Sequence, residues 1–296
     1  MPSYLKPDVL ARAESLGLKA RQLVEGLRVG DHKSPYKGFS VEFVQHREYV
    51  PGDDIRHIDW KSYGRSERYT IKQYEQETNY IAHIIVDCSN SMRYGSGDTN
   101  KLEYAKLIAA SLSYLIVRQR DSVALRTFND AWVAELPPSS QLGHINTITH
   151  TLEETQPRQK TRIGPLLDEV ADRITRRGIV FLISDCFDNV ESTLAGLRHL
   201  RFRGHEVVLF HVMHKDEVEF PLDGNIRFIG LEGFEELMTR PHLLRPAYLR
   251  VIEKYLGAMQ KGCDGSGVDY VRMMTSRPLV ASLGEYLVRR LQTGRR

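Results

Sequence analysis

The sequence predicts an α/β protein built on a doubly wound, mostly parallel sheet with helices on both faces. Three continuous apolar runs, at residues 80–86, 178–184 and 206–212, are typical of strands that are buried on both sides. Segments with apolar residues at helical spacing separate these runs, and such alternation favours parallel strands joined by helical crossovers. An N-terminal helix and a small β extension are expected to precede this sheet.

The front of the chain differs in character from the rest. Residues 8–27 carry apolar side chains at helical spacing and Gly30 follows their end, so a helix is expected there. Residues 41–50 and 68–75 are predicted to be strands, separated by the turn Pro51-Gly52-Asp53-Asp54. We therefore divide the chain into residues 1–77, which hold the helix and the β extension, and residues 78–296, which hold the α/β domain.

The elements of the α/β domain follow in order. A helix over 101–117 begins with Asn100 and Glu103, a spacing that is typical of a helix cap. A strand at 122–128 and helices near 140–154 and 164–176 come next, and a helix over 190–201 separates the second and third apolar runs. The tail predicts a helix at 246–260, a strand at 268–273 and a helix at 279–291. Residues 215–245 predict no regular element.

Composition excludes several classes of protein. The 296 residues contain 41 Lys and Arg against 38 Asp and Glu, whereas a dedicated nucleic-acid binder usually has a strong basic excess. Three Cys are too few for a disulfide scaffold and fit a reducing compartment. The N-terminus has no apolar signal region, and no apolar run approaches the roughly 20 residues of a membrane helix. We expect a cytoplasmic protein with no nucleic-acid partner and no membrane insertion.

Carboxylates follow two of the apolar runs. Asp87-Cys88-Ser89-Asn90-Ser91 comes directly after the first run, and Asp185 directly after the second. The carboxyl ends of parallel strands meet at one edge of a sheet, where such folds bind ligands. Carboxylate and hydroxyl oxygens in one tight loop suit Mg²⁺, which keeps part of its water shell. The spacing therefore predicts a metal-ion-dependent adhesion site for Mg²⁺, and Mn²⁺ or Ca²⁺ accept the same ligands.

Two stretches of the sequence resemble a known family. The block Arg47-Glu48-Tyr49-Val50-Pro51-Gly52-Asp53-Asp54-Ile55-Arg56-His57-Ile58-Asp59-Trp60-Lys61 and the Asp87 loop resemble domain-of-unknown-function family 58, which has a von Willebrand factor A-like fold. The resemblance covers residues from about 30 to 215. It implies that Ser89, Ser91 and Thr161 bind the metal directly, and that Asp87 and Asp185 bind it directly or through water. Relatives often accompany a MoxR-type AAA+ ATPase, so the resemblance implies such an ATPase, or a protein that offers an acidic side chain, as the partner.

Two interpretations of the signature block stay open. In the first, Arg56, Asp59 and Arg65 form a buried ion network that holds the segment in place, with Trp60 as its apolar anchor. In the second, the block is a surface for a partner protein. The residues that either interpretation uses are Arg47, Tyr49, Pro51, Gly52, Asp53, Asp54, Arg56, Asp59 and Trp60.

These observations predict a non-enzymatic, metal-ion-dependent protein-interaction module. It would act as an adaptor with a MoxR-type AAA+ ATPase in the assembly or activation of protein complexes. The sequence has no Walker A motif and no Gly-x-Ser-x-Gly nucleophile elbow. Two alternatives remain: a metal-dependent hydrolase or phosphatase that uses Asp87 and Asp185, and an A-like domain whose metal site is vestigial. A redox pair of Cys88 and Cys186 is a further open interpretation.

Overall fold

The computed structural model describes residues 41–50, 59–66, 69–76, 81–158, 160–230 and 237–293. These residues belong to two compact units, a small β unit within 31–79 and an α/β unit from residue 80 onward. Each unit is described by itself below. The predicted helix over 8–27 lies outside the described residues.

The small unit is an antiparallel hairpin. β1 (Val41–Glu48) pairs with β2 (Thr70–Gln76), so the two predicted strands are confirmed with slightly different bounds. A short helix, α2 (Trp60–Ser66), lies between them in sequence and was not predicted. Asp59 directly precedes this helix and caps it, because its Oδ1 accepts a hydrogen bond from the Ser62 amide at 3.2 Å. A side-chain acceptor at this position satisfies an amide that has no partner within the helix.

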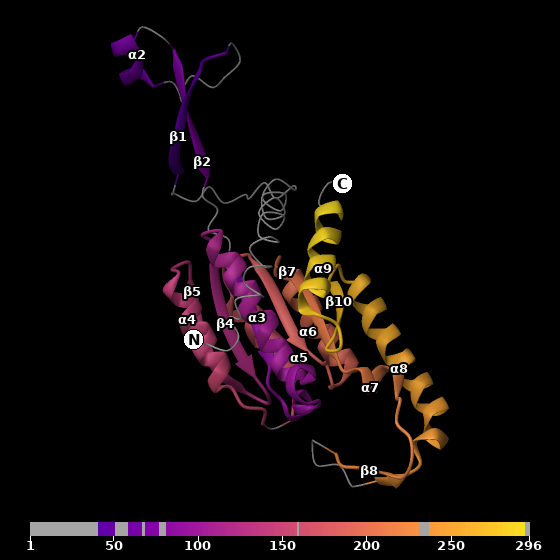
Figure 1. Cartoon of the computed structure of the whole chain (residues 1–296). Coiled ribbons are helices and arrows are strands. Elements are labelled where there is room, and N and C mark those ends of the chain that lie inside the picture. Colours follow the sequence, from indigo (N-terminus) through magenta and orange to yellow (C-terminus); the bar gives the residue numbers. More distant parts are fainter. Residues whose placement is uncertain are drawn as a thin grey trace. The chain divides into compact units, whose positions relative to one another are not determined.

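A six-stranded sheet forms the centre of the α/β unit, and it confirms the predicted fold class. Its order is β10-β7-β6-β3-β4-β5, and all neighbours are parallel except the edge pair β4 and β5. The strands, coloured from magenta to yellow in Figure 1, are β3 (Ile81–Asp87), β4 (Ser122–Phe128), β5 (Trp132–Ser139), β6 (Ile179–Ser184), β7 (Glu206–Met213) and β10 (Asp269–Met274).

Helices cover both faces of this sheet, because consecutive side chains of each strand point to opposite sides. Ile84 and Val86 of β3 pack in one apolar cluster, and Ile85 packs in the other. The first cluster contains side chains of α3 (Lys101–Arg118), α4 (Gly143–Glu154) and α9 (Leu279–Thr293). The second contains side chains of α5 (Ile163–Arg173), α6 (Val190–Phe202) and α8 (Pro241–Asp264). The continuous apolar runs therefore reflect strands with a helix layer on each side.

Several elements differ from the sequence prediction. β5 was missed, since it carries Pro137 and Pro138 and is tolerated only as an edge strand. Residues 215–245, which predicted no element, contain α7 (Lys215–Glu219), β8 (Ile226–Phe228), β9 (Leu237–Thr239) and the start of α8. Among the described residues no helix combines the length and apolar character needed to cross a membrane.

The burial of His83 in the sheet predicts that the protein loses folding stability in acid. It is a buried residue of β3, and its Nδ1 lies 3.3 Å from Nη1 of Arg126. Burial, then the positive charge of Arg126, lowers the pKa of His83 from 6.5 to about 3. The folded state thus disfavours the cationic form of His83. The contribution of neutral His83 to folding stability is therefore complete above pH 6.5 and is lost as the pH falls towards 3.

We expect the unfolding free energy of His83→Leu to fall less than that of the wild type between neutral pH and pH values near 5. The difference in slope from the wild type is at most about 1.4 kcal/mol per pH unit. Urea titrations of both proteins at several pH values measure it. Identical slopes in the two proteins would show that other groups govern the acid response.

Candidate metal centre

The candidate centre lies at the point where the strand order of the sheet reverses. β4 follows β3 on one side and β6 lies on its other side, so the carboxyl ends of β3 and β6 flank the crevice. Open α/β sheets bind ligands at this position. Asp87 is the last residue of β3, and Ser184 is the last residue of β6. The register that aligns Val86 with Ile183 brings these two ends together.

Asp87 connects the parts of the centre through hydrogen bonds. It is fully buried, and its Oδ2 accepts hydrogen bonds from Ser184 Oγ at 2.6 Å and from Thr161 Oγ1 at 3.4 Å. Its Oδ1 accepts the amide of Ser89 at 2.8 Å. One carboxylate thus joins the ends of two strands and the loop before α5. Ser89, which the loop spacing predicted, and Thr161, which the family resemblance implied, both contact Asp87.

The two serines of the Asp-x-Ser-x-Ser loop face each other. Ser89 Oγ and Ser91 Oγ lie 3.0 Å apart, and both residues are buried. A 3₁₀ turn over Asn90–Arg93 shapes the loop, and Met92 in this turn is fully buried in the core. The buried Met92 therefore anchors the loop in the core, with the Ser89 hydroxyl beside Asp87 and the Ser91 hydroxyl beside Asp185.

Asp185 is held by a lysine that the sequence analysis missed. Lys101, the first residue of α3, donates to Asp185 Oδ2 at 2.7 Å and to Glu217 Oε1 of α7 at 2.6 Å. The amide of Phe187 donates to the other oxygen, Asp185 Oδ1, at 3.1 Å. Only 1% of the Lys101 side chain and 2% of the Asp185 side chain are exposed, so water screens this ion pair little.

The surroundings shift the pKa values of the two buried carboxyl groups, Asp87 and Asp185, in opposite directions. Burial, and then the charge of Asp185, raises the pKa of Asp87 to about 7. Burial acts on Asp185 in the same sense, but the charge and hydrogen bond of Lys101 outweigh it and hold the pKa of Asp185 below its usual value. The charge of Asp185 is therefore compensated by the Lys101 ammonium. The charge of Asp87 is uncompensated, and a bound cation would stabilise that carboxylate in its charged form.

The donor set fits a hard divalent cation in part. Asp87, Ser89, Ser91 and Thr161 supply one carboxylate and three hydroxyl oxygens in one buried cluster, a set that suits Mg²⁺. Asp185 belongs to the same cluster, but the Lys101 ammonium already neutralises it. The described residues contain no group of three or more His, Cys, Asp or Glu side chains that could hold a metal ion. Metal binding here would depend on the hydroxyl ligands.

Cys88 and Cys186 do not face each other. Cys88 packs in one apolar cluster and Cys186 in the other, so the sheet separates them. Both thiols are free and buried, and burial raises the pKa of Cys88 to about 12 and that of Cys186 well above its usual value. The thiolate, which is the reactive form, is therefore disfavoured at both positions. This placement argues against the redox pair.

The signature block is described only in part. Arg47 lies in β1, opposite Ile71 of β2, and the Tyr49 amide donates to the Tyr69 carbonyl at 2.9 Å. Pro51, Gly52, Asp53, Asp54 and Arg56 lie outside the described residues. Asp59 is buried and caps α2, in keeping with a structural role.

Trp60 corrects one detail of the predicted block. In the first interpretation of the block it is an apolar anchor, but 62% of the residue is exposed, which does not support that role. It is the first residue of α2, where its ring makes an edge contact with Tyr63 at 6.3 Å between centroids. Tyr63 in turn stacks on Tyr69 at 4.5 Å. The tyrosines, not the tryptophan, thus form the aromatic contact with the start of β2.

Three exposed arginines belong to the loops that form the centre. The Arg158 amide donates to the Cys88 carbonyl at 3.0 Å, and Arg162 directly follows Thr161, so both residues belong to the loop that closes the site. Arg93 ends the 3₁₀ turn after Ser91. We call these three exposed residues, Arg93, Arg158 and Arg162, the basic rim. Phe187, 58% exposed, adds an apolar side chain from the loop after β6.

Comparison with known proteins identifies the family. The model of a family described as "Protein of unknown function DUF58" matches residues 45–254. The chain belongs to the DUF58 family. The match includes the described parts of the signature block and all five predicted ligands, from Asp87 to Asp185. This finding confirms the family that the signature block and the Asp87 loop predicted.

Relatives of this DUF58 protein align over nearly its whole length. "Uncharacterized protein Rv1480" of Mycobacterium tuberculosis (strain ATCC 25618 / H37Rv) is 24% identical over 302 aligned positions, which cover 98% of this chain and 93% of the relative. "Uncharacterized protein Mb1516" of Mycobacterium bovis gives the same values. The two units therefore occur together in these relatives.

Solved structures align with a smaller part of the chain. The conserved hypothetical protein BatB from Bacteroides thetaiotaomicron is 19% identical and covers 72% of this chain and 99% of its own, with a TM-score of 0.48. The SpRpn10 VWA domain is 11% identical and covers 71% of this chain and 94% of its own, with a TM-score of 0.40.

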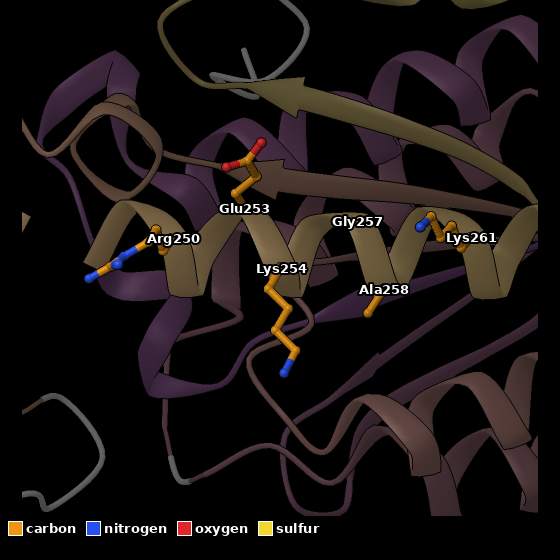
Figure 2. A pocket seen from close by; sticks show the side chains of 6 residues that line it. All are labelled: Arg250, Glu253, Lys254, Gly257, Ala258 and Lys261. Carbon is orange, nitrogen blue, oxygen red and sulfur yellow. The ribbon is translucent and has the colours of Figure 1, made fainter. Parts of the chain in front are cut away.

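A second surface feature lies on α8. A shallow hollow is lined by Arg250, Glu253, Lys254, Gly257, Ala258 and Lys261 (Figure 2). All six residues come from one helix, and none of them is buried. The hollow removes no polar group from water, so it has none of the features that make the centre at Asp87 a candidate site.

Proposed function

We propose that this DUF58 protein is a non-enzymatic, metal-ion-dependent protein-interaction module. The observation that carries the proposal is the convergence of Asp87, Ser89, Ser91 and Thr161 in one buried oxygen cluster at the reversal point of the sheet. Asp87 would hold the ion by charge, and the three hydroxyls would hold it as neutral ligands. When bound, Mg²⁺ would supply a positive centre able to take an oxygen ligand from a partner.

The surroundings of the centre favour an acidic partner. Arg93, Arg158 and Arg162 of the basic rim are exposed and come from loops that form the centre. Exposed charges of one sign steer an oppositely charged partner toward a site and orient it there. Phe187 beside them offers an apolar contact. We infer that an acidic side chain of the partner approaches the centre through this rim.

The kind of partner follows from the family resemblance. Relatives often accompany a MoxR-type AAA+ ATPase, so we propose that this ATPase is the partner and that the protein acts as an adaptor in the assembly or activation of other complexes. A cytoplasmic location is part of this proposal.

A binding experiment tests the proposal. The full chain is immobilised, proteins retained from a lysate are identified, and the retained protein is purified and titrated against the chain in Mg²⁺ and in EDTA. We expect Asp87→Ala to abolish the Mg²⁺-dependent part of binding, because no other carboxylate of the cluster is uncompensated. We expect Arg158→Glu/Arg162→Glu to weaken binding at least tenfold, about 1.4 kcal/mol, because it reverses the charge of the rim.

The matched control reverses two charges elsewhere. Arg250→Glu/Lys254→Glu changes the net charge equally, but both residues lie on α8 (Figure 2). It is expected to bind the partner as the wild type does. Equal binding in EDTA and by Asp87→Ala would contradict the proposal and favour a vestigial site. Turnover of phosphate esters with Mg²⁺ would instead favour a hydrolase.

A further inference from the structure

Lys101 is a buried cation inside the candidate centre. Its side chain is 1% exposed, although it is the first residue of α3 and helix starts are usually solvated. Two of its three N–H groups donate to carboxylates, Asp185 at 2.7 Å and Glu217 at 2.6 Å. Its Nζ also lies 6.0 Å from the ring centroid of Tyr94, which helps to cover it. Lysine is almost never fully buried without such pairing.

The position of Lys101 affects how the centre binds a metal ion. Asp185 is one of the five predicted ligands, yet one of its oxygens bonds to Lys101 and the other to the Phe187 amide. The carboxylate is therefore neutralised and fixed in place. A divalent cation beside Asp185 would also meet the positive charge of the ammonium, and like charges repel strongly in a buried setting. Only Asp87 remains as an uncompensated carboxylate.

We propose that Lys101 is a built-in competitor of the metal ion: by neutralising Asp185 and Glu217 it keeps the affinity of the centre for divalent cations low. This inference rests on the proposed function, since it takes Asp87, Ser89, Ser91 and Thr161 as the ligands. A weakly held ion gains much from one additional carboxylate. The ion and an acidic partner therefore bind cooperatively, and the centre is fully loaded only in the complex.

A pair of single variants separates this role from a general effect of charge. Lys101→Gln removes the ammonium but keeps a donor for Asp185. Lys106→Gln is the matched control, since Lys106 is also buried on α3 and pairs at 3.0 Å with Glu103 of the same helix. Both variants lose one positive charge from the same helix. Mg²⁺ and Mn²⁺ are titrated into the full-length chains by calorimetry at fixed ionic strength, after circular dichroism has verified the fold.

The expected result is a Kd for Mg²⁺ at least tenfold lower in Lys101→Gln than in the wild type, which corresponds to about 1.4 kcal/mol, with Lys106→Gln close to the wild type. If Lys101→Gln does not fold, Lys101→Gln/Glu217→Gln replaces it, because this double variant removes both members of an ion pair. The same increase in affinity for Mg²⁺ is expected, since both variants lack the ammonium that neutralises Asp185.

Each outcome decides a different point. Metal binding by the wild type with no increase in the Lys101 variants overturns the inference and leaves the proposed function standing. An equal increase in Lys106→Gln also overturns it. Binding by the Lys101 variants but not by the isolated wild type supports the inference, because the affinity of the wild-type centre is then too low to measure without a partner. No binding by any of these proteins overturns both.

Discussion

Asp87→Asn is expected to stabilise the metal-free protein, by on the order of 3 kcal/mol near pH 8. Asp87 is fully buried, and burial together with the nearby charge of Asp185 raises its pKa to about 7. The charged form is therefore unfavourable in the folded protein at this pH. Asparagine keeps the shape of the side chain and carries no charge, so it removes the charge penalty, while its single oxygen accepts hydrogen bonds at only one of the two positions that Asp87 uses. Urea unfolding in EDTA measures the difference.

The contribution of Asp87 makes the unfolding free energy of the metal-free wild type fall as the pH rises. The pKa of Asp87 in the folded state, about 7, lies above the unfolded value of 3.8. The folded state thus binds more protons, and the contribution of Asp87 to stability is lost as the pH rises through 7. In EDTA the wild type should lose unfolding free energy between about pH 4 and 7, and Asp87→Asn should lose less over the same range.

Magnesium should narrow the difference in stability between the two proteins. A cation that binds the folded state stabilises it by RT ln(1 + [L]/Kd), and Asp87 is the carboxylate that would hold it. We expect Mg²⁺ to raise the melting temperature of the wild type and not that of Asp87→Asn. Asp121→Asn is the control, because Asp121 is also buried but directly precedes Ser122 at the amino end of β4, the opposite edge of the sheet. A Mg²⁺ effect that persists in Asp87→Asn would contradict the assignment.

The success of the fold prediction has a physical cause. β3, β6 and β7 are buried on both faces, so nearly every residue is apolar and the runs stand out in the sequence. The predicted cap of α3 is confirmed by the hydrogen bond from the Glu103 amide to Asn100 Oδ1 at 3.1 Å. β5 lacks such a signal, because an edge strand with prolines shows neither a continuous run nor strong strand formers.

The start of α8 was missed for a related reason. The helix begins at Pro241, but the residues from 242 to 247 are exposed, so no apolar stripe marks its first turns. The prediction began only at residue 246, near the part of the helix that packs on the sheet through Leu256, Met259 and Cys263. Periodicity detects the buried portion of a helix and not the portion that extends into solvent.

The candidate centre was predictable in its ligands but not in Lys101. The Asp87 loop and Asp185 were found because both follow buried strands. A lysine at a helix start is ordinarily a solvated charge, and Lys101 was therefore overlooked. One signal was available: Lys101 lies on the same helical stripe as Ala105, Ile108, Leu112 and Leu115, all of them buried. A charged residue in line with a buried stripe indicates a buried counter-charge, which here is supplied by Asp185 and Glu217.

Gly164→Ala is expected to disturb both the fold and the Thr161 ligand. Gly164 is the second residue of α5, three positions after Thr161, and it allows α5 to approach α6 closely. A Cβ at this position would lie 2.0 Å from Ser192 Oγ and 2.8 Å from the Ser192 carbonyl oxygen. The hydroxyl could rotate away, but the carbonyl belongs to the backbone of α6, so the helices must separate. Overpacking of this kind costs about 1–3 kcal/mol.

Gly257→Ala is the matched control for this effect. Gly257 also lies within a helix, α8 (Figure 2). A Cβ there would meet no atom within 4 Å. Alanine is the better helix former by about 0.8–1 kcal/mol, so this variant should be slightly more stable than the wild type. Thermal melting and Mg²⁺ titration of both variants distinguish packing from helix propensity. If Gly164→Ala melts with the wild type and binds Mg²⁺ equally, then α5 does not position Thr161, and the ligand set must be reduced to Asp87 and the two serines.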